Sequence, residues 1–120
     1  MRDRRFRVLV VEDEMLVAMN IEDMLAELGH EVAGVALRID AALAMAAAES
    51  FDVAMLDVNL AGTPSYPVAD LLLGRGLPFL FATGYDRRGL EENYRVHPLL
   101  QKPFRLLDLG QALTRLIEPG

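Results

Sequence analysis

The amino-acid sequence predicts an α/β fold in which a parallel β-sheet is covered by helices on both faces. Short runs rich in β-forming residues alternate with longer stretches rich in Ala and Leu along the chain, and this alternation is typical of parallel sheets. Several of the short runs are apolar nearly throughout, as expected of strands that are buried on both faces. The length of 120 residues suits one domain with its own core. We therefore expect residues 1–120 to form a single domain.

The first half of the chain is expected to form a strand, a helix, a second strand and a second helix, at residues 6–11, 14–28, 31–36 and 40–49. The first strand is nearly all apolar, and the first helix repeats its apolar residues at helical spacing. Gly29 provides a stop for that helix. The second strand is the weaker of the two, and the second helix is Ala-rich with Asp40 as its N-cap.

The second half is expected to contain three further strands and two further helices, at residues 53–56, 78–82 and 98–101 and at residues 65–74 and 104–117. The turn-forming residues 59–64 and Pro67 mark the start of the first of these helices, and Gly74 marks its end. A stripe of Leu supports the second helix, although Gly110 within it costs about 1 kcal/mol relative to Ala. Residues 87–94 have little apolar face and would form only a short helix.

The composition of the chain excludes several classes of function. The net charge of −6 argues against a nucleic-acid-binding module, which usually carries a basic face. No uncharged apolar run approaches the ~20 residues that span a bilayer, and the charged first residues do not resemble a signal peptide. The chain has no cysteine, which excludes disulfides and thiolate metal sites and is compatible with a reducing cytoplasm. We expect a cytoplasmic protein that binds neither nucleic acid nor membrane.

Polar side chains follow four of the expected strands at the point where each strand ends. Glu12 and Asp13 follow the first strand, Asp57 follows the third, Thr83 the fourth, and Lys102, the only lysine of the chain, the fifth. Each alone has an ordinary explanation as a helix cap, a turn residue or a solvated loop residue. In an open parallel sheet, however, ligands bind beyond the carboxyl ends of the strands. The occurrence of these residues together at four strand ends therefore predicts one site that contains three carboxylates, a hydroxyl and an ammonium group.

These groups suit the transfer of a phosphoryl group to a carboxylate. Three neighbouring acids repel one another, and a hard divalent cation such as Mg²⁺, which takes oxygen ligands, relieves the repulsion. Asp57 is the nucleophile that would form an acyl phosphate. The transferring group needs positive charge and hydrogen-bond donors, which Lys102, the Thr83 hydroxyl and the Gly84 amide would supply. Asn59 would offer its backbone carbonyl to the metal, with its side chain facing the mouth of the site.

The set formed by Glu12-Asp13, Asp57, Thr83 and Lys102-Pro103, in this order and at these strand ends, resembles the receiver domain of two-component response regulators. The resemblance covers residues 6–117, which is nearly the whole chain. It implies a flavodoxin-like (βα)5 fold, a doubly wound parallel sheet with strand order 2-1-3-4-5.

The resemblance also implies a function. It implies that Mg²⁺ (or Mn²⁺) is bound by Asp13, Asp57 and the Asn59 carbonyl, with Glu12 acting through water. It implies that Asp57 takes its phosphoryl group from a sensor histidine kinase or a histidine phosphotransfer protein, and that this switches partner binding. A receiver catalyses only its own phosphorylation and slow dephosphorylation, so we do not expect an enzyme in the usual sense.

The stretch Pro-Phe-Leu-Phe-Ala-Thr-Gly-Tyr at residues 78–85 resembles the receiver subgroup called FAT GUY, which often occurs beside HWE-type histidine kinases. Leu99 stands where many receivers carry a switch aromatic, and the segment between Thr83 and Lys102 is short. We therefore hypothesise that phosphorylation pulls Thr83 inward and orders residues 84–93, with Tyr85 as the reporting side chain. The alternative is that Tyr85 only packs over a hydrophobic edge.

Three rival functions are considered. A haloacid-dehalogenase-type phosphatase also forms an aspartyl phosphate, but it needs a second Asp where this chain has Asn59. A nucleotide-binding module would need a glycine-rich phosphate loop, and the sequence has none. A receiver that works unphosphorylated, as an interaction module, is the remaining alternative. The sequence leaves open the cognate kinase, the pathway, the oligomeric state, and whether the domain stands alone or belongs to a longer regulator.

Overall fold

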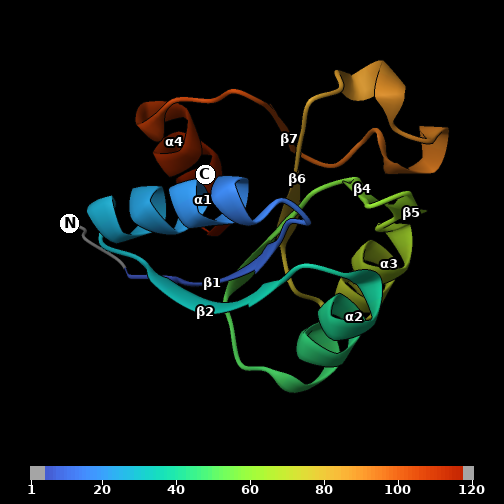
Figure 1. Cartoon of the computed structure of the whole chain (residues 1–120), viewed down its shortest axis with the longest axis horizontal. Coiled ribbons are helices and arrows are strands. Elements are labelled where there is room, and N and C mark those ends of the chain that lie inside the picture. Colours follow the sequence, from blue (N-terminus) through green and yellow to red (C-terminus); the bar gives the residue numbers. More distant parts are fainter. Residues whose placement is uncertain (1–4, 118–120) are drawn as a thin grey trace.

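The computed structural model describes residues 5–117, which contain a sheet of five parallel strands. The strands are β1 (Arg7–Val11), β2 (Glu31–Ala36), β3 (Val53–Leu56), β6 (Phe79–Thr83) and β7 (Leu99–Gln101). Their order in the sheet is β2-β1-β3-β6-β7 (Figure 1). Counted along the chain this is the expected order 2-1-3-4-5, so the flavodoxin-like α/β fold is confirmed.

Four α-helices cover the sheet: α1 (Met15–Glu27), α2 (Ile39–Ala48), α3 (Tyr66–Arg75) and α4 (Leu106–Ile117). Helices α1 and α4 lie on one face and α2 and α3 on the other (Figure 1). Each corresponds to a helix that the sequence predicts, with ends displaced by at most two residues. None of the helices within residues 5–117 combines the length and the hydropathy that crossing a bilayer requires.

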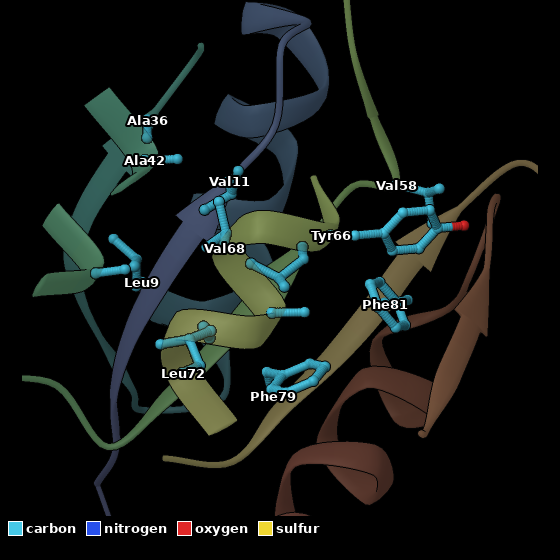
Figure 2. Close-up of a cluster of buried hydrophobic side chains, with 14 of the residues drawn as sticks. Leu9, Val11, Ala36, Ala42, Val58, Tyr66, Val68, Leu72, Phe79 and Phe81 are labelled. Carbon is cyan, nitrogen blue, oxygen red and sulfur yellow. The ribbon is translucent and has the colours of Figure 1, made fainter. Parts of the chain in front are cut away.

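Successive side chains of each strand enter two separate cores, because neighbouring residues of a strand point to opposite faces. On β3, Val53 and Met55 pack toward α1 and α4, whereas Ala54 and Leu56 pack toward α2 and α3. Figure 2 shows the second core, in which Phe79 and Phe81 of β6 lie beside Tyr66 of α3 and Val58. Burial on both faces explains why β3 is apolar throughout and β6 is apolar up to Thr83.

The helix ends correct two details of the sequence analysis. Asp40 is not the N-cap of α2; Arg38 occupies that position, and the Asp40 carboxylate accepts a hydrogen bond from the next amide within the first turn. Helix α3 continues one residue past Gly74 to Arg75 and is capped by Gly76, whose φ of +70° is the left-handed conformation that glycine adopts without strain. The stop at Gly29 is confirmed, with a φ of +86°.

The expected turn at residues 59–64 is a small hairpin of β4 (Asn59–Leu60) and β5 (Thr63–Pro64). Its two loop residues, Ala61 and Gly62, both have positive φ, at 52° and 92°, as in the type I′ turns that favour hairpins. For Ala61 this conformation costs about 1–2 kcal/mol. The surrounding structure therefore compensates for a backbone geometry that alanine does not favour.

Between β6 and β7, in place of the expected short helix, the chain forms two 3₁₀ turns, η1 (Arg87–Gly89) and η2 (Glu92–Tyr94). Aromatic contacts fasten this segment to α3: the rings of Tyr94 and Tyr66 stack at 4.2 Å. The Tyr94 hydroxyl donates to Asp70 at 2.8 Å, a bond that raises the pKa of Tyr94 to about 12. The Tyr66 hydroxyl accepts from the Glu91 amide at 2.9 Å. Leu90, between the two turns, is 2% exposed.

We predict that Leu90→Ala destabilises the fold by about 2–5 kcal/mol, because it opens a cavity beneath a segment that has no long helix of its own. Urea unfolding measures the change. The matched control is Leu107→Ala, since Leu107 is 62% exposed and should shift the free energy of unfolding by no more than about 0.5 kcal/mol. Equal effects of the two substitutions would contradict the anchoring role of Leu90.

Candidate functional site

Three carboxylates meet at the carboxyl end of the sheet. Glu12 and Asp13 follow β1 and Asp57 follows β3, and one oxygen of each lies within 4.8 Å of the others. The backbone ladder extends one residue beyond the strands, so that the amides just past three strand ends donate to the neighbouring strand: Glu12 to Ala36, Asp57 to Val11 and Lys102 to Thr83. Regular parallel pairing therefore positions the backbone of the residues that the sequence singles out.

Lys102 reaches this cluster from the edge strand β7. Its ammonium group donates a hydrogen bond to one oxygen of Glu12 and lies 3.4 Å from Oδ2 of Asp57. The Lys102 side chain is 20% exposed and that of Glu12 only 1%. The lysine thus bridges two of the three acids, one of which is buried.

Burial and charge act against each other in this pair. Burial raises the pKa of Glu12 to about 7, and the hydrogen bonds from Lys102 and from the Glu14 amide offset only part of that effect. Burial alone would lower the pKa of Lys102, but its bond to Glu12 and the charge of Asp57 outweigh burial and raise it. Lys102 is therefore an ammonium ion at neutral pH, held by negative charge at the sheet edge.

Asp13 is bound by the β4–β5 hairpin. Its Oδ2 accepts a hydrogen bond of 3.0 Å from the backbone amide of Ala61. The side chain of Asn59 accepts one of 2.6 Å from the amide of Gly62, the other loop residue. The sequence predicts the Asn59 side chain at the mouth of the site. Asn59 does border the pocket, but its side-chain oxygen is engaged by the hairpin loop.

Thr83 is the last residue of β6 and is 1% exposed. Its hydroxyl accepts a hydrogen bond of 3.3 Å from the amide of Tyr85. Gly84 is exposed with open space beside it, and Tyr85 is 51% exposed. Thr83, Gly84 and Tyr85 line, with Asp13, Asp57, Asn59 and Lys102, an open pocket of about 340 Å³.

Leu99 lies outside this pocket. It pairs with Phe81 in the sheet and packs, partly buried, against the core on the α2 and α3 side. The position at which many receivers carry a switch aromatic is thus filled by an aliphatic core contact.

The acid cluster fits a hard divalent cation. Carboxylate oxygens are the ligands that Mg²⁺ prefers, and Glu12, Asp13 and Asp57 bring theirs together from two adjacent strands. A cation there would also relieve the repulsion that Lys102 balances in part. The amide of Ala61 was not predicted from the sequence as a partner of Asp13. The pair Ala61-Gly62 before Thr63-Pro64 was the available signal, but it reads as an ordinary turn.

Solved structures of the same fold cover nearly the whole chain. The solution structure of SdrG from Sphingomonas melonis Fr1 is 40% identical, with coverage of 97% of this chain and 98% of that one and a TM-score of 0.84. The receiver (REC) domain of the response regulator PhyR from Erythrobacter litoralis is 31% identical, with 93% and 89% coverage and a TM-score of 0.81. The response regulator PhyR from Brucella abortus is 32% identical over 97% of this chain and 49% of that one, with a TM-score of 0.84.

Curated relatives agree with the solved structures. The phyllosphere-induced regulator PhyR of Methylorubrum extorquens is 32% identical over 96% of this chain and 45% of its own length. The transcriptional regulatory protein PdtaR of Mycobacterium tuberculosis is 31% identical over 89% of this chain and 54% of its own length. The chain thus spans about half the length of these relatives. No family model matches the chain. The fold and these relatives together show that the chain belongs to the receiver domains of two-component response regulators.

Proposed function

We propose that Asp57 accepts a phosphoryl group from a phosphohistidine of a partner protein, and that this modification switches the binding of a further partner. The observation that carries the proposal is the bridge of Lys102 between Glu12 and Asp57, beside Asp13 at the carboxyl end of the sheet. A carboxylate nucleophile, further acids for a cation and one ammonium group are the parts that this chemistry requires.

In the proposed transfer, an oxygen of Asp57 attacks the phosphorus of the phosphohistidine, a P–O bond forms, and the P–N bond breaks. The imidazole leaves as a neutral ring when its other nitrogen carries the proton. Lys102, 3.4 Å from Asp57, would exchange part of its contact with the carboxylates for the phosphoryl oxygens. The Thr83 hydroxyl and the Gly84 amide would donate to the same oxygens.

Asp13, Asp57 and the backbone carbonyl of Asn59 would hold Mg²⁺ or Mn²⁺, with Glu12 acting through water. The bound cation would supply positive charge to the phosphoryl oxygens. Glu12 would have a second task, because its contact keeps Lys102 at the site before the phosphoryl group arrives. The domain would catalyse its own phosphorylation and dephosphorylation and no other reaction.

Two alternatives are less well supported. A haloacid-dehalogenase-type phosphatase would need an acid at position 59 to protonate the leaving group. Asn59 is an amide, and its oxygen accepts from Gly62. A receiver that works unphosphorylated would not need Asp13, Asp57 and Lys102 together, yet all three line one pocket.

Incubation with acetyl phosphate and Mg²⁺ tests the proposal. Intact-mass measurement should show the addition of one phosphoryl group to the wild-type protein and none to Asp57→Asn. Asp23→Asn, on the exposed side of α1, is the matched control and should be modified like the wild type. Chelation of Mg²⁺ should prevent the modification. An adduct that persists in Asp57→Asn, or its absence from the wild type, would contradict the proposal.

The switch that we propose begins at Thr83. Its hydroxyl accepts a hydrogen bond from the Tyr85 amide. A movement of Thr83 toward the phosphoryl group would therefore pull on the backbone of residues 84–93 and order them. Leu99 provides no aromatic ring to follow Thr83 inward, which leaves Tyr85, half exposed beside the pocket, as the reporting side chain.

Beryllofluoride with Mg²⁺, which mimics the phosphoryl group, should slow amide hydrogen exchange in residues 84–93 of the wild type. Thr83→Ala should lose most of this protection, since the hydroxyl that links the site to Tyr85 is gone. Amide exchange in α2, which packs against α3 and β2, should stay the same in both proteins. Unchanged exchange of residues 84–93 in the wild type would refute this switch.

We further propose that the phosphoryl donor, an HWE-type histidine kinase or a histidine phosphotransfer protein, docks on α1. Three large apolar side chains at the start of this helix are exposed next to the acid cluster: Met15 at 60%, Leu16 at 82% and Met19 at 51%. An apolar groove lined by Leu16, Ile21, Lys102 and Phe104 adjoins them. The same proposal includes the assignment of the chain to the FAT GUY subgroup, which rests on residues 78–85.

Leu16→Ser should slow phosphotransfer from a phosphorylated HWE-type kinase of the same genome roughly five- to tenfold, which corresponds to about 1 kcal/mol of docking energy. Phosphorylation by acetyl phosphate, which needs no docking surface, should stay at the wild-type rate. Leu73→Ser is the control, because Leu73 is 50% exposed but lies on α3. Equal slowing with both donors would place the effect in the site and not in docking.

A further inference from the structure

The β4–β5 hairpin begins two residues after Asp57 and leads into α3 beside the carboxyl end of the sheet (Figure 1). In a two-residue hairpin loop, the amides of the two loop residues take no part in the ladder between the strands. On an exposed loop these amides can bond water or side-chain acceptors. Here both have one, and the two acceptors are side chains that come from different parts of the site.

The two hydrogen bonds form a continuous chain from one strand end to the other. The Asn59 side chain, next to β3, accepts from Gly62 at 2.6 Å, and the adjacent amide of Ala61 donates to Asp13, next to β1, at 3.0 Å. Asp13 and Ala61 are 48 residues apart in the sequence. The hairpin loop therefore links Asp13, which follows β1, to the segment that follows β3.

The backbone conformation of Ala61 indicates that the position of its amide is important. Its φ of 52° is unfavourable for a residue with a side chain, whereas glycine would adopt it freely. The conformation is nevertheless kept, and its amide is directed at a carboxylate oxygen. Among residues 5–117, the hydrogen bond to Asp13 engages Oδ2, so that the other oxygen stays available as a metal ligand.

We propose that the hairpin is a positioning element for the cation site, in which the Ala61 amide orients the Asp13 carboxylate and the Asn59 side chain holds the hairpin loop. The inference rests on the proposed function, since it assumes that Asp13 binds a divalent cation. Partners that orient a metal ligand typically change metal affinity 10- to 100-fold when they are lost. Asn59 would thus act twice, through its carbonyl as a ligand and through its side chain as a support for another ligand.

Asn59→Ala separates the two roles, because it removes the side-chain acceptor and leaves the backbone carbonyl. Mg²⁺ binding to the unphosphorylated protein is measured by calorimetry, and amide exchange at Ala61 and Gly62 by NMR. We expect the Mg²⁺ affinity to fall about tenfold and both amides to exchange faster, while exchange in β1 and β3 stays as in the wild type. Asn93→Ala, an exposed asparagine in η2, is the matched control and should change neither quantity.

Asn59→Asp provides a second test, because a carboxylate can still accept from Gly62. It should restore slow exchange at both loop amides, which a general loss of packing would not allow. Faster exchange in Asn59→Ala with unchanged Mg²⁺ affinity would overturn the positioning role and leave the proposed function intact. Failure of the wild-type protein to bind Mg²⁺ would instead refute the proposed function, and this inference with it.

Discussion

The repulsion among Glu12, Asp13 and Asp57 is the constraint on which the site depends. Parallel pairing of β1 with β3 forces these acids together, and burial makes the charge on Glu12 costly, with a pKa raised to about 7. Lys102 offsets part of that cost from the edge strand β7. Lys102 reaches the acids only if β6 pairs with β3 and β7 pairs with β6. The electrostatics of the site therefore depend on the strand order of the sheet. A cluster balanced by one lysine is also poised to exchange contacts when a cation or a phosphoryl group enters.

Most of the fold could be predicted because its determinants are local. Strands buried on both faces are nearly all apolar: β3 is apolar throughout, and β1 and β6 each carry a single polar residue, Arg7 and Thr83. Amphipathic helices repeat their apolar residues at a period that the sequence displays. The membership of Glu12, Asp13, Asp57 and Lys102 in one site followed from the rule that strand ends share an edge. It needed no knowledge of distances, only of strand direction.

The remaining features depend on contacts between distant residues. The hydrogen bond from the Ala61 amide to Asp13 joins residues that are 48 positions apart in the sequence. An Ala-Gly pair also does not predict a hairpin in which the alanine has a positive φ. The segment between β6 and β7 has a weak helical pattern, yet Tyr66, Asp70 and Leu90 determine how it lies. The start of α2 also differs from the prediction, because Arg38 and not Asp40 is its N-cap. The extended backbone at Arg38, and not the preferred cap residue, decides where α2 begins.

The central claim is that Asp57, among the acids of the cluster, carries the phosphoryl group. Borohydride reduces an acyl phosphate to an alcohol, so a phosphorylated aspartate becomes homoserine at the position where the phosphoryl group was attached. Peptide mapping of the phosphorylated and reduced protein therefore identifies the acceptor directly. The account predicts homoserine at position 57 and unmodified Glu12 and Asp13. Homoserine at position 13, or its absence from position 57 in a protein shown to carry a phosphoryl group, would contradict the account.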